Sequence, residues 1–192
     1  MKKKITLILL LLISCTSKQQ TVEIHQMDNT LPTVLRLNKN NNRLMAINFP
    51  IKIRLKNRTN HNKVFSYYKY WYNINENKIT GLPAKVYKLN KNKMIKISKF
   101  STDTLKINQS RQYIIYTTHL IDSTKYSINA LKPHVVEMKK KNLDSLPIEN
   151  LTQFKKKYQN ILKEMIVSDF IEFQMQDLNS NNKSSYKHSI KL

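Results

Sequence analysis

The sequence predicts a mainly β protein, folded as an antiparallel sandwich with one amphipathic helix near its C-terminus. First, every odd position from 47 to 55 is apolar and most even positions are polar, the period of a strand with one buried face. Second, short segments rich in β-branched and aromatic residues recur between asparagine-rich loops, which is typical of sandwiches and barrels. Third, one late segment carries apolar residues at helical spacing.

The clearest predicted strand covers residues 47–57. Because Pro50 has no backbone N–H to donate, we expect this strand to start at a sheet edge or at a bulge. The chain holds a single glycine, so asparagine, which tolerates left-handed backbone, is expected to make the turns. Further strands are expected at 33–37, 64–72, 83–89, 94–98, 105–107, 113–121 and 169–176.

The expected helix covers about residues 146–166. It lies between two predicted strands, as a crossover that covers one end of the sandwich would. Asp144 or Ser145 is its expected N-cap, with Pro147 in the first turn. The apolar stripe of this helix consists of Leu151, Phe154, Tyr158, Ile161, Leu162 and Met165.

The N-terminus has the pattern of an export signal. A basic start at Lys2–Lys4 precedes an apolar stretch from Ile5 to Ile13, and the only cysteine of the chain, Cys15, follows. This stretch is much shorter than the roughly 20 apolar residues that a membrane-spanning helix needs. We therefore expect residues 1–14 to be a signal peptide.

Leu12-Ile13-Ser14-Cys15 resembles the lipobox of bacterial lipoproteins. The resemblance implies that a diacylglycerol is attached to the Cys15 sulfur, that cleavage makes this residue the N-terminus, and that its amine is then acylated. Thr16 follows in place of an aspartate, which implies the outer membrane. Residues 17–22 lack the acidic run that resembles a surface-export signal in Bacteroidota, so a periplasm-facing anchor is favoured over surface display. The alternative is a plain secretory signal with an incidental cysteine.

These features divide the chain into four parts. After the signal at 1–14, residues 15–43 are expected to be the lipidated cysteine and a polar tether. Residues 44–177 form the predicted sandwich domain with its helix. Residues 178–192 are rich in Ser, Asn and Lys and are expected to be a disordered tail.

The string IKIRLKNRTNHNKVFSYY, residues 51–68, resembles the B-to-C region of bacterial immunoglobulin-like domains. Residues 105–107 followed by 113–116 resemble their E–F corner. The resemblance implies an immunoglobulin-like antiparallel sandwich. The cysteine pair of that family is absent, because Cys15 is the only cysteine.

The chain is strongly basic, with a formal net charge of +22 that falls to +19 when residues 1–14 are removed. Two interpretations stay open. Lysine, asparagine and isoleucine, whose codons are AT-rich, are abundant, while glycine, alanine and arginine are rare, so codon bias accounts for much of the charge. Alternatively, a basic face binds a polyanion such as an anionic glycan or lipopolysaccharide phosphates.

The aromatic run at 65–72 suggests a ligand surface. If exposed, such rings stack on sugars, and neighbouring cations bind anionic groups. If buried, they are a core strand with a cross-strand tyrosine ladder on its other face. The candidate ligand face comprises Lys52, Arg54, Lys56, Tyr68, Tyr70 and Tyr72.

Motifs for catalysis or metal binding are absent from the sequence. No two of the five histidines have metal-ligand spacing, and neither a nucleophile motif nor a glycine-rich phosphate loop occurs. We therefore predict no enzyme, no catalytic residues, no metal and no cofactor, with a hydrolase site assembled in space as the alternative. Three Asp-Ser/Thr sequences resemble the O-glycosylation motif of Bacteroidota, with acceptors Thr104, Ser123 and Ser145.

Together these observations predict a lipid-anchored protein of the cell envelope that acts as a non-enzymatic binding or assembly module for another envelope protein. The alternatives are an inhibitor or immunity lipoprotein, and a salt-sensitive binder of anionic glycan or lipopolysaccharide. The membrane is engaged through the diacylglyceryl group on Cys15, and no specific nucleic-acid partner is expected.

Overall fold

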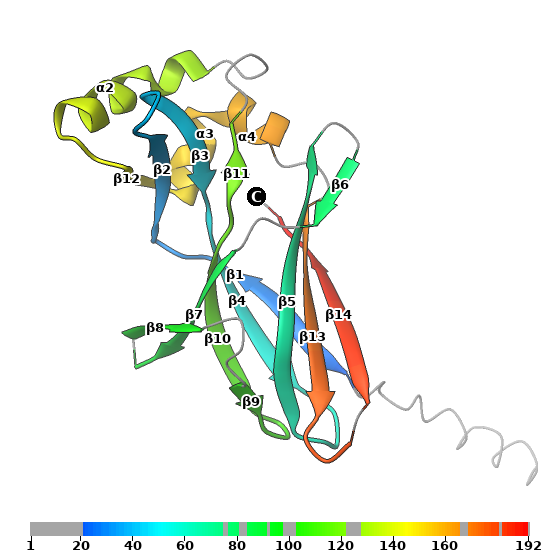
Figure 1. The fold of residues 1–192 in the computed structure, drawn as a ribbon. Coiled ribbons are helices and arrows are strands. Elements are labelled where there is room, and N and C mark those ends of the chain that lie inside the picture. Colours follow the sequence, from blue (N-terminus) through cyan, green and yellow to red (C-terminus); the bar gives the residue numbers. More distant parts are fainter. Residues whose placement is uncertain are drawn as a thin grey trace, which may run out of the picture.

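The computed structural model describes residues 21–74, 77–80, 84–91, 93–97, 103–121, 128–165, 169–180 and 182–191. The described part of the chain is mainly β and its strands pair antiparallel, which confirms the predicted class (Figure 1). The signal segment and two predicted modification sites, Cys15 and Ser123, lie outside these residues.

The strands form three sheets. Sheet A has the order β1 (Val22–Met27), β4 (Pro50–Asn57), β10 (Ser110–Tyr116), β7 (Lys85–Asn90) and β8 (Lys93–Ile97). Sheet B has the order β11 (His119–Leu120), β3 (Arg43–Asn48), β2 (Pro32–Asn38) and β12 (Ser145–Asn150). Sheet C has the order β14 (Lys183–Ser189), β13 (Phe170–Asp177), β5 (Lys63–Ile74) and β6 (Asn77–Thr80), with β9 (Asp103–Leu105) also paired to β5.

Sheets A and B are joined by two chain segments that run through both. Only Phe49 separates β3 from β4, and only Thr117 and Thr118 separate β10 from β11. At this junction the Thr117 N–H donates to the Phe49 carbonyl at 3.0 Å, so the two segments stay paired where the sheet bends. Pro50 begins β4, a position where a missing N–H is tolerated.

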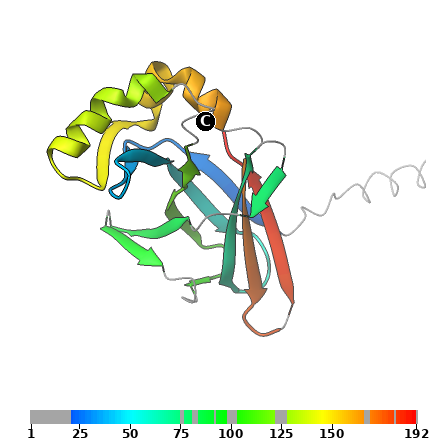
Figure 2. The ribbon, with the colours of Figure 1, turned by 45° about the horizontal axis from the view of Figure 1, so that its top comes forward.

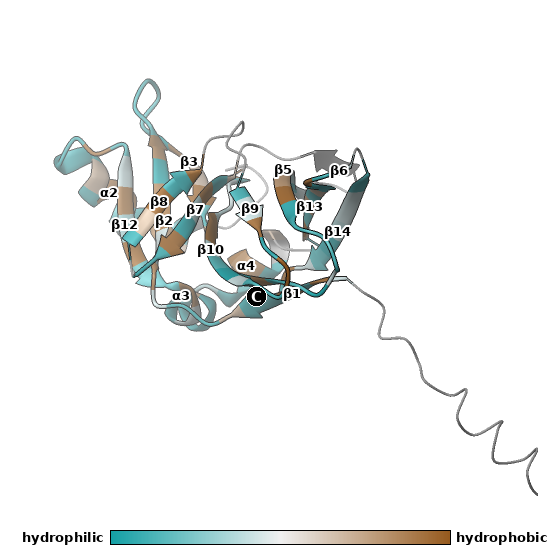
Figure 3. Ribbon diagram, turned by 90° about the horizontal axis from the view of Figure 1, so that it is seen from below, coloured by the Kyte–Doolittle hydropathy of each residue, from teal (hydrophilic) through white to brown (hydrophobic). Residues whose placement is uncertain are grey.

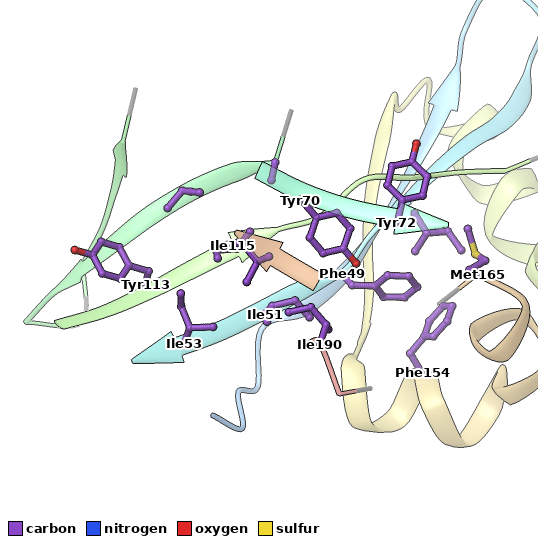
Figure 4. Packing of buried hydrophobic residues seen from close by; sticks show 14 of the residues in the cluster. Phe49, Ile51, Ile53, Tyr70, Tyr72, Tyr113, Ile115, Phe154, Met165 and Ile190 are labelled. Carbon is purple, nitrogen blue, oxygen red and sulfur yellow. The ribbon is translucent and has the colours of Figure 1, made fainter. Parts of the chain in front are cut away.

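The core lies between the inner faces of sheets A and C. Ile51, Ile53 and Leu55 are at most 1% exposed, as their alternation with polar residues predicts. They face the inner residues of β13 and β5, and Phe65 of sheet C stacks on Tyr113 of sheet A with ring centroids 5.7 Å apart. Figure 4 shows Ile51, Ile53 and Tyr113 among the packed side chains of this core. Figure 3 shows the hydrophobic stretches along the strands and α4, with hydrophilic loops at the rim.

A helical layer covers the end of the molecule that carries sheet B (Figure 2). Its elements are η1 (Ile128–Leu131), α2 (Lys132–Lys140), α3 (Leu151–Lys157) and α4 (Gln159–Met165). The Phe154 ring is fully buried and meets Phe49 edge-on, with ring centroids 5.3 Å apart. The predicted apolar stripe is therefore real, because its residues from Phe154 to Met165 are at most 5% exposed.

The prediction of a single helix over 146–166 is wrong. Residues 145–150 form β12, in which Pro147 pairs with Val34, and the helical part is divided at Tyr158, where ψ is 39°. The N-cap is Asn150, whose side chain accepts from the Gln153 N–H while the Gln153 side chain accepts from the Asn150 N–H. This capping box places the helix start six residues later than Asp144.

The expected tether and the expected disordered tail are also wrong where these segments form strands. Residues 22–27 and 32–38 form β1 and β2, and residues 183–189 form β14. β14 is a polar segment and β1 has apolar residues only at Val22, Ile24 and Met27, and both pair with strands that carry a clear apolar alternation, β13 and β4. Strand formation here depends on the neighbouring strand more than on local composition.

Asparagine does make turns, as expected. Asn42, Asn108 and Asn142 adopt positive φ, as does Lys91, the one lysine in this set. In the described part of the chain, no helix is long and apolar enough to cross a membrane.

Candidate functional site

The candidate ligand face from the sequence does not exist as one surface. Lys52, Arg54 and Lys56 lie on the outer face of sheet A, opposite the buried side of β4. Tyr70 and Tyr72 belong to sheet C, point into the core and are 2% and 4% exposed. The structure therefore separates the predicted cations from the predicted tyrosines.

A β-bulge explains the error. In the pairing of β5 with β13, Tyr67 lies opposite Gln174 and Phe65 lies opposite Met175, so Ser66 is an extra residue. One inserted residue exchanges the two faces of a strand. Phe65 and Tyr70 thus both face inward, although strict alternation would place them on opposite faces.

The three tyrosines make contacts within the protein. The Tyr68 hydroxyl donates to the Ala84 carbonyl at 3.0 Å. Tyr70 stacks on Tyr72 with ring centroids 6.2 Å apart. These contacts agree with the alternative interpretation of the aromatic run as a core strand.

The outer face of sheet A carries a groove instead. Its floor includes Ile114, one wall is the β7–β8 hairpin, and the other wall is formed by residues 28–31 and β2. Two adjoining cavities of about 260 and 470 Å³ share Met94, which reaches over the floor from β8. A third cavity of about 550 Å³ continues the groove, since it shares Lys52 and Leu89 with the second.

The groove is strongly cationic. Among the residues that the structure describes, Asp28 is the one acidic side chain that lines these three cavities. Six cations line them, so an anionic partner is favoured over a cationic one. They are Arg36, Lys52, Lys85, Lys88, Lys91 and Arg111.

Two tyrosines give the groove an aromatic corner. Tyr87 from β7 and Tyr116 from β10 meet edge-on with ring centroids 6.1 Å apart, beside Lys85. Burial and the nearby Tyr87 raise the pKa of Tyr116, so its hydroxyl stays neutral and can donate or accept at neutral pH. This corner offers a flat apolar surface with polar tips, a combination enriched at interfaces.

Asp103 orients the cations at one end of the groove. Its Oδ1 accepts from Lys88 Nζ at 3.0 Å and from Arg111 Nη1, while its Oδ2 accepts from the Tyr113 hydroxyl at 3.0 Å. Burial raises the pKa of Asp103, but these hydrogen bonds and the charge of Arg111 outweigh burial and hold it below its usual range. Because β9 pairs with sheet C, Asp103 also links sheets A and C.

We expect Asp103→Asn to lower the free energy of unfolding by about 1–3 kcal/mol at neutral pH, since it removes the charge-assisted bonds. Because the pKa of Asp103 is lower in the folded state, its charged form stabilises the fold at pH values above its unfolded-state pKa of about 4. This stabilisation is lost as the pH falls through the folded-state pKa. The difference between Asp103→Asn and the parent should therefore shrink between about pH 5 and pH 2 in urea unfolding. The exposed Glu137→Gln, which loses only an i,i+4 pair with Lys141, serves as the control. A difference that stays constant over this range would contradict the assignment.

A second polar cluster is sealed in the core. The Asp169 Oδ2 accepts from the Tyr70 hydroxyl at 2.5 Å and lies 2.9 Å from His119 Nε2, while Thr117 Oγ1 lies 3.3 Å from His119 Nδ1. These four side chains are at most 2% exposed. Burial and the Asp169 carboxylate raise the pKa of Tyr70 well above its usual range, so the phenol keeps its proton and donates.

The cluster is positioned for structure more than for chemistry. It joins β5, β11 and the residue that precedes β13, and burial at this level leaves a substrate no access. No local pattern signals this cluster, because Tyr70, His119 and Asp169 lie 49 to 99 positions apart in the sequence. The groove was missed for the same reason, since its lining comes from four separate parts of the chain.

Two predicted glycosylation acceptors lie in the described residues. Thr104 is half-buried in β9, between Asp103 and the buried Leu105. Ser145 is half-buried at the start of β12, and its hydroxyl donates to Asp144 at 3.0 Å. Both occupy strands.

Comparison with known proteins does not assign a family to this chain. The sequence matches no family model, and it matches none of the curated proteins searched.

Proposed function

We propose that this protein is a lipid-anchored, non-enzymatic binding module that holds another cell-envelope protein in the groove beneath the β7–β8 hairpin. The observation that carries this proposal is the convergence of six cations on a surface that also exposes Met94. Of the described residues, Asp28 is the only acid that lines this surface, and Asp103 pairs with two of the six cations, Lys88 and Arg111. The opposite face of the same sheet fills the core, so the groove is built on a rigid support. Rigid support of a mixed apolar and charged surface favours specific binding.

The anchor and the location are part of the same proposal. Lipid on Cys15 would place the module at the outer membrane, facing the periplasm. An immunoglobulin-like arrangement of sheets A and C is supported by their face-to-face core. Such sandwiches host many unrelated functions, so the function is inferred from the groove and not from the fold.

The test is affinity capture of the full lipidated chain from the envelope of the cells that make it, followed by washes in low and then high salt. We expect one stoichiometric protein to survive high salt. The groove variant Arg36→Glu/Lys85→Glu should lose at least about tenfold of this protein, because like charges across an interface cost several kcal/mol.

The matched control is Lys139→Glu/Lys140→Glu. It makes the same charge change at the exposed end of α2 and should retain the partner. Equal losses in the two variants would show that net charge, and not the groove, does the binding, and would contradict the proposal. Fractionation of Cys15→Ala tests the anchor, since a variant that still pellets with membranes is not held by lipid on that residue.

An anionic glycan is the second candidate, favoured by the Tyr87–Tyr116 corner beside Lys85. Rings of this kind stack on sugars while the cations contact acidic groups. Capture of glycan that is lost in high salt, without a retained protein, would favour this candidate over a protein partner.

A further inference from the structure

Strand β8 is an exposed edge of sheet A. In the described part of the chain it pairs only with β7, and the hairpin projects from the side of the molecule (Figures 1 and 2). Four of its five residues are exposed and only Ile97 is buried. Met94 and Ile95, on opposite faces of the strand, are 45% and 50% exposed, although both are large apolar residues.

The register shows which backbone groups of β8 do not pair with β7. Asn90 lies opposite Lys93, so a two-residue loop closes the hairpin, and Lys91 in that loop has a φ of 43°. The closing pair of such a hairpin is hydrogen-bonded, and hydrogen-bonded and non-bonded pairs then alternate. The N–H and C=O groups of Met94 and Lys96 therefore point away from β7.

An edge with free groups and apolar side chains is a template for another strand. Natural edges are commonly protected by charge, and β8 carries Lys93 and Lys96, but it keeps two exposed apolar residues between them. The edge also adjoins the groove, because Met94 lines two of its cavities. A strand added here would lie beside the surface already assigned to the partner.

The charge pattern of β8 indicates what kind of segment can pair with it. Reading along the strand, Lys93, Met94, Ile95 and Lys96 give a cation, two apolar residues and a cation. Opposite charges and apolar pairs are the favoured cross-strand neighbours. A second copy of this chain is disfavoured, since its net charge of +22 opposes self-association.

We propose that the partner docks by adding an extended segment to β8, and that this segment carries an acidic residue, two apolar residues and a second acidic residue in succession. The acids lie opposite Lys93 and Lys96, and the apolar pair lies opposite Met94 and Ile95. This inference rests on the proposed function and specifies the partner's recognition element.

The test uses the full chain and the synthetic peptide Thr-Glu-Val-Val-Glu-Thr, with Thr-Lys-Val-Val-Lys-Thr as the charge control. We expect the acidic peptide to bind, the basic one not to bind, and hydrogen exchange of the 93–97 backbone to slow in the complex. Lys96→Ala should weaken binding a few-fold, because it removes one charge and leaves the outward N–H in place. Lys96→Pro should weaken it at least about tenfold more, because it removes that N–H without breaking a bond to β7.

Equal affinities of Lys96→Pro and Lys96→Ala would overturn strand addition, as would unchanged exchange in the 93–97 backbone. If Lys96→Pro and Lys96→Ala have similar thermal unfolding midpoints, the hairpin is intact in the proline variant. If proline lowers the midpoint, strand addition is judged only by whether the peptide slows hydrogen exchange of the 93–97 backbone in the parent chain. If Arg36→Glu/Lys85→Glu loses the envelope partner and Lys96→Pro retains it, the groove is the binding site and strand addition to β8 is rejected. If the groove variant retains the partner, the proposed function itself fails.

Discussion

Asp169→Ala is expected to lower the free energy of unfolding by about 3–5 kcal/mol, the range observed when one partner of a buried polar or ionic pair is removed. The carboxylate is 1% exposed and accepts from Tyr70 while contacting His119. Its removal leaves both groups buried without their partner and opens a small cavity. Urea unfolding at neutral pH measures the change.

Tyr70→Phe is the matched variant for this cluster. It removes one hydroxyl and leaves the contact between Asp169 and His119 in place, so a loss of about 1–2 kcal/mol is expected. If Asp169→Ala cost no more than Tyr70→Phe, the cluster would not be the polar link between β5, β11 and β13 that its geometry indicates.

Phe154→Ala should cost about 3–5 kcal/mol, the usual range for a buried phenylalanine. Its ring is fully buried against Phe49 (Figure 4), and the ring centroids of Phe154 and Tyr158 are 4.7 Å apart. Because Phe49 lies at the junction of sheets A and B, this one side chain couples α3 to both sheets. Denaturant unfolding followed by far-ultraviolet circular dichroism measures the loss.

Val136→Ala provides the comparison for Phe154→Ala. Val136 lies on α2 and is 58% exposed, so its truncation should change stability by less than about 0.5 kcal/mol. An equally small effect of Phe154→Ala would mean that the helical layer does not unfold together with the sheets.

Strand positions with an apolar alternation were predictable from the sequence. Ile51, Ile53 and Leu55 are buried on one face of β4, as are Ile171 and Phe173 on one face of β13. The helical stripe was predictable in the same way. In each case local periodicity and burial agree, because one face of the element meets the core along its whole length.

Features that depend on distant pairing were not predictable. The bulge at Ser66 exchanges the faces of β5, and nothing in the run from 65 to 72 signals it. β14 has a polar sequence and pairs with β13, and β1, which has too short an alternation to stand out, pairs with β4. The groove arises where the β7–β8 hairpin approaches residues 28–36, and no local pattern encodes that approach.

The most direct test of the groove as a binding surface is site-specific photo-crosslinking of the full chain in its own envelope. A photoreactive amino acid at Met94 lies in the groove, and the same amino acid at Val136 lies on exposed α2 as the control. We predict one major crosslinked envelope protein from position 94 that is absent from position 136. Identical patterns from the two positions, or no crosslink from Met94, would contradict it.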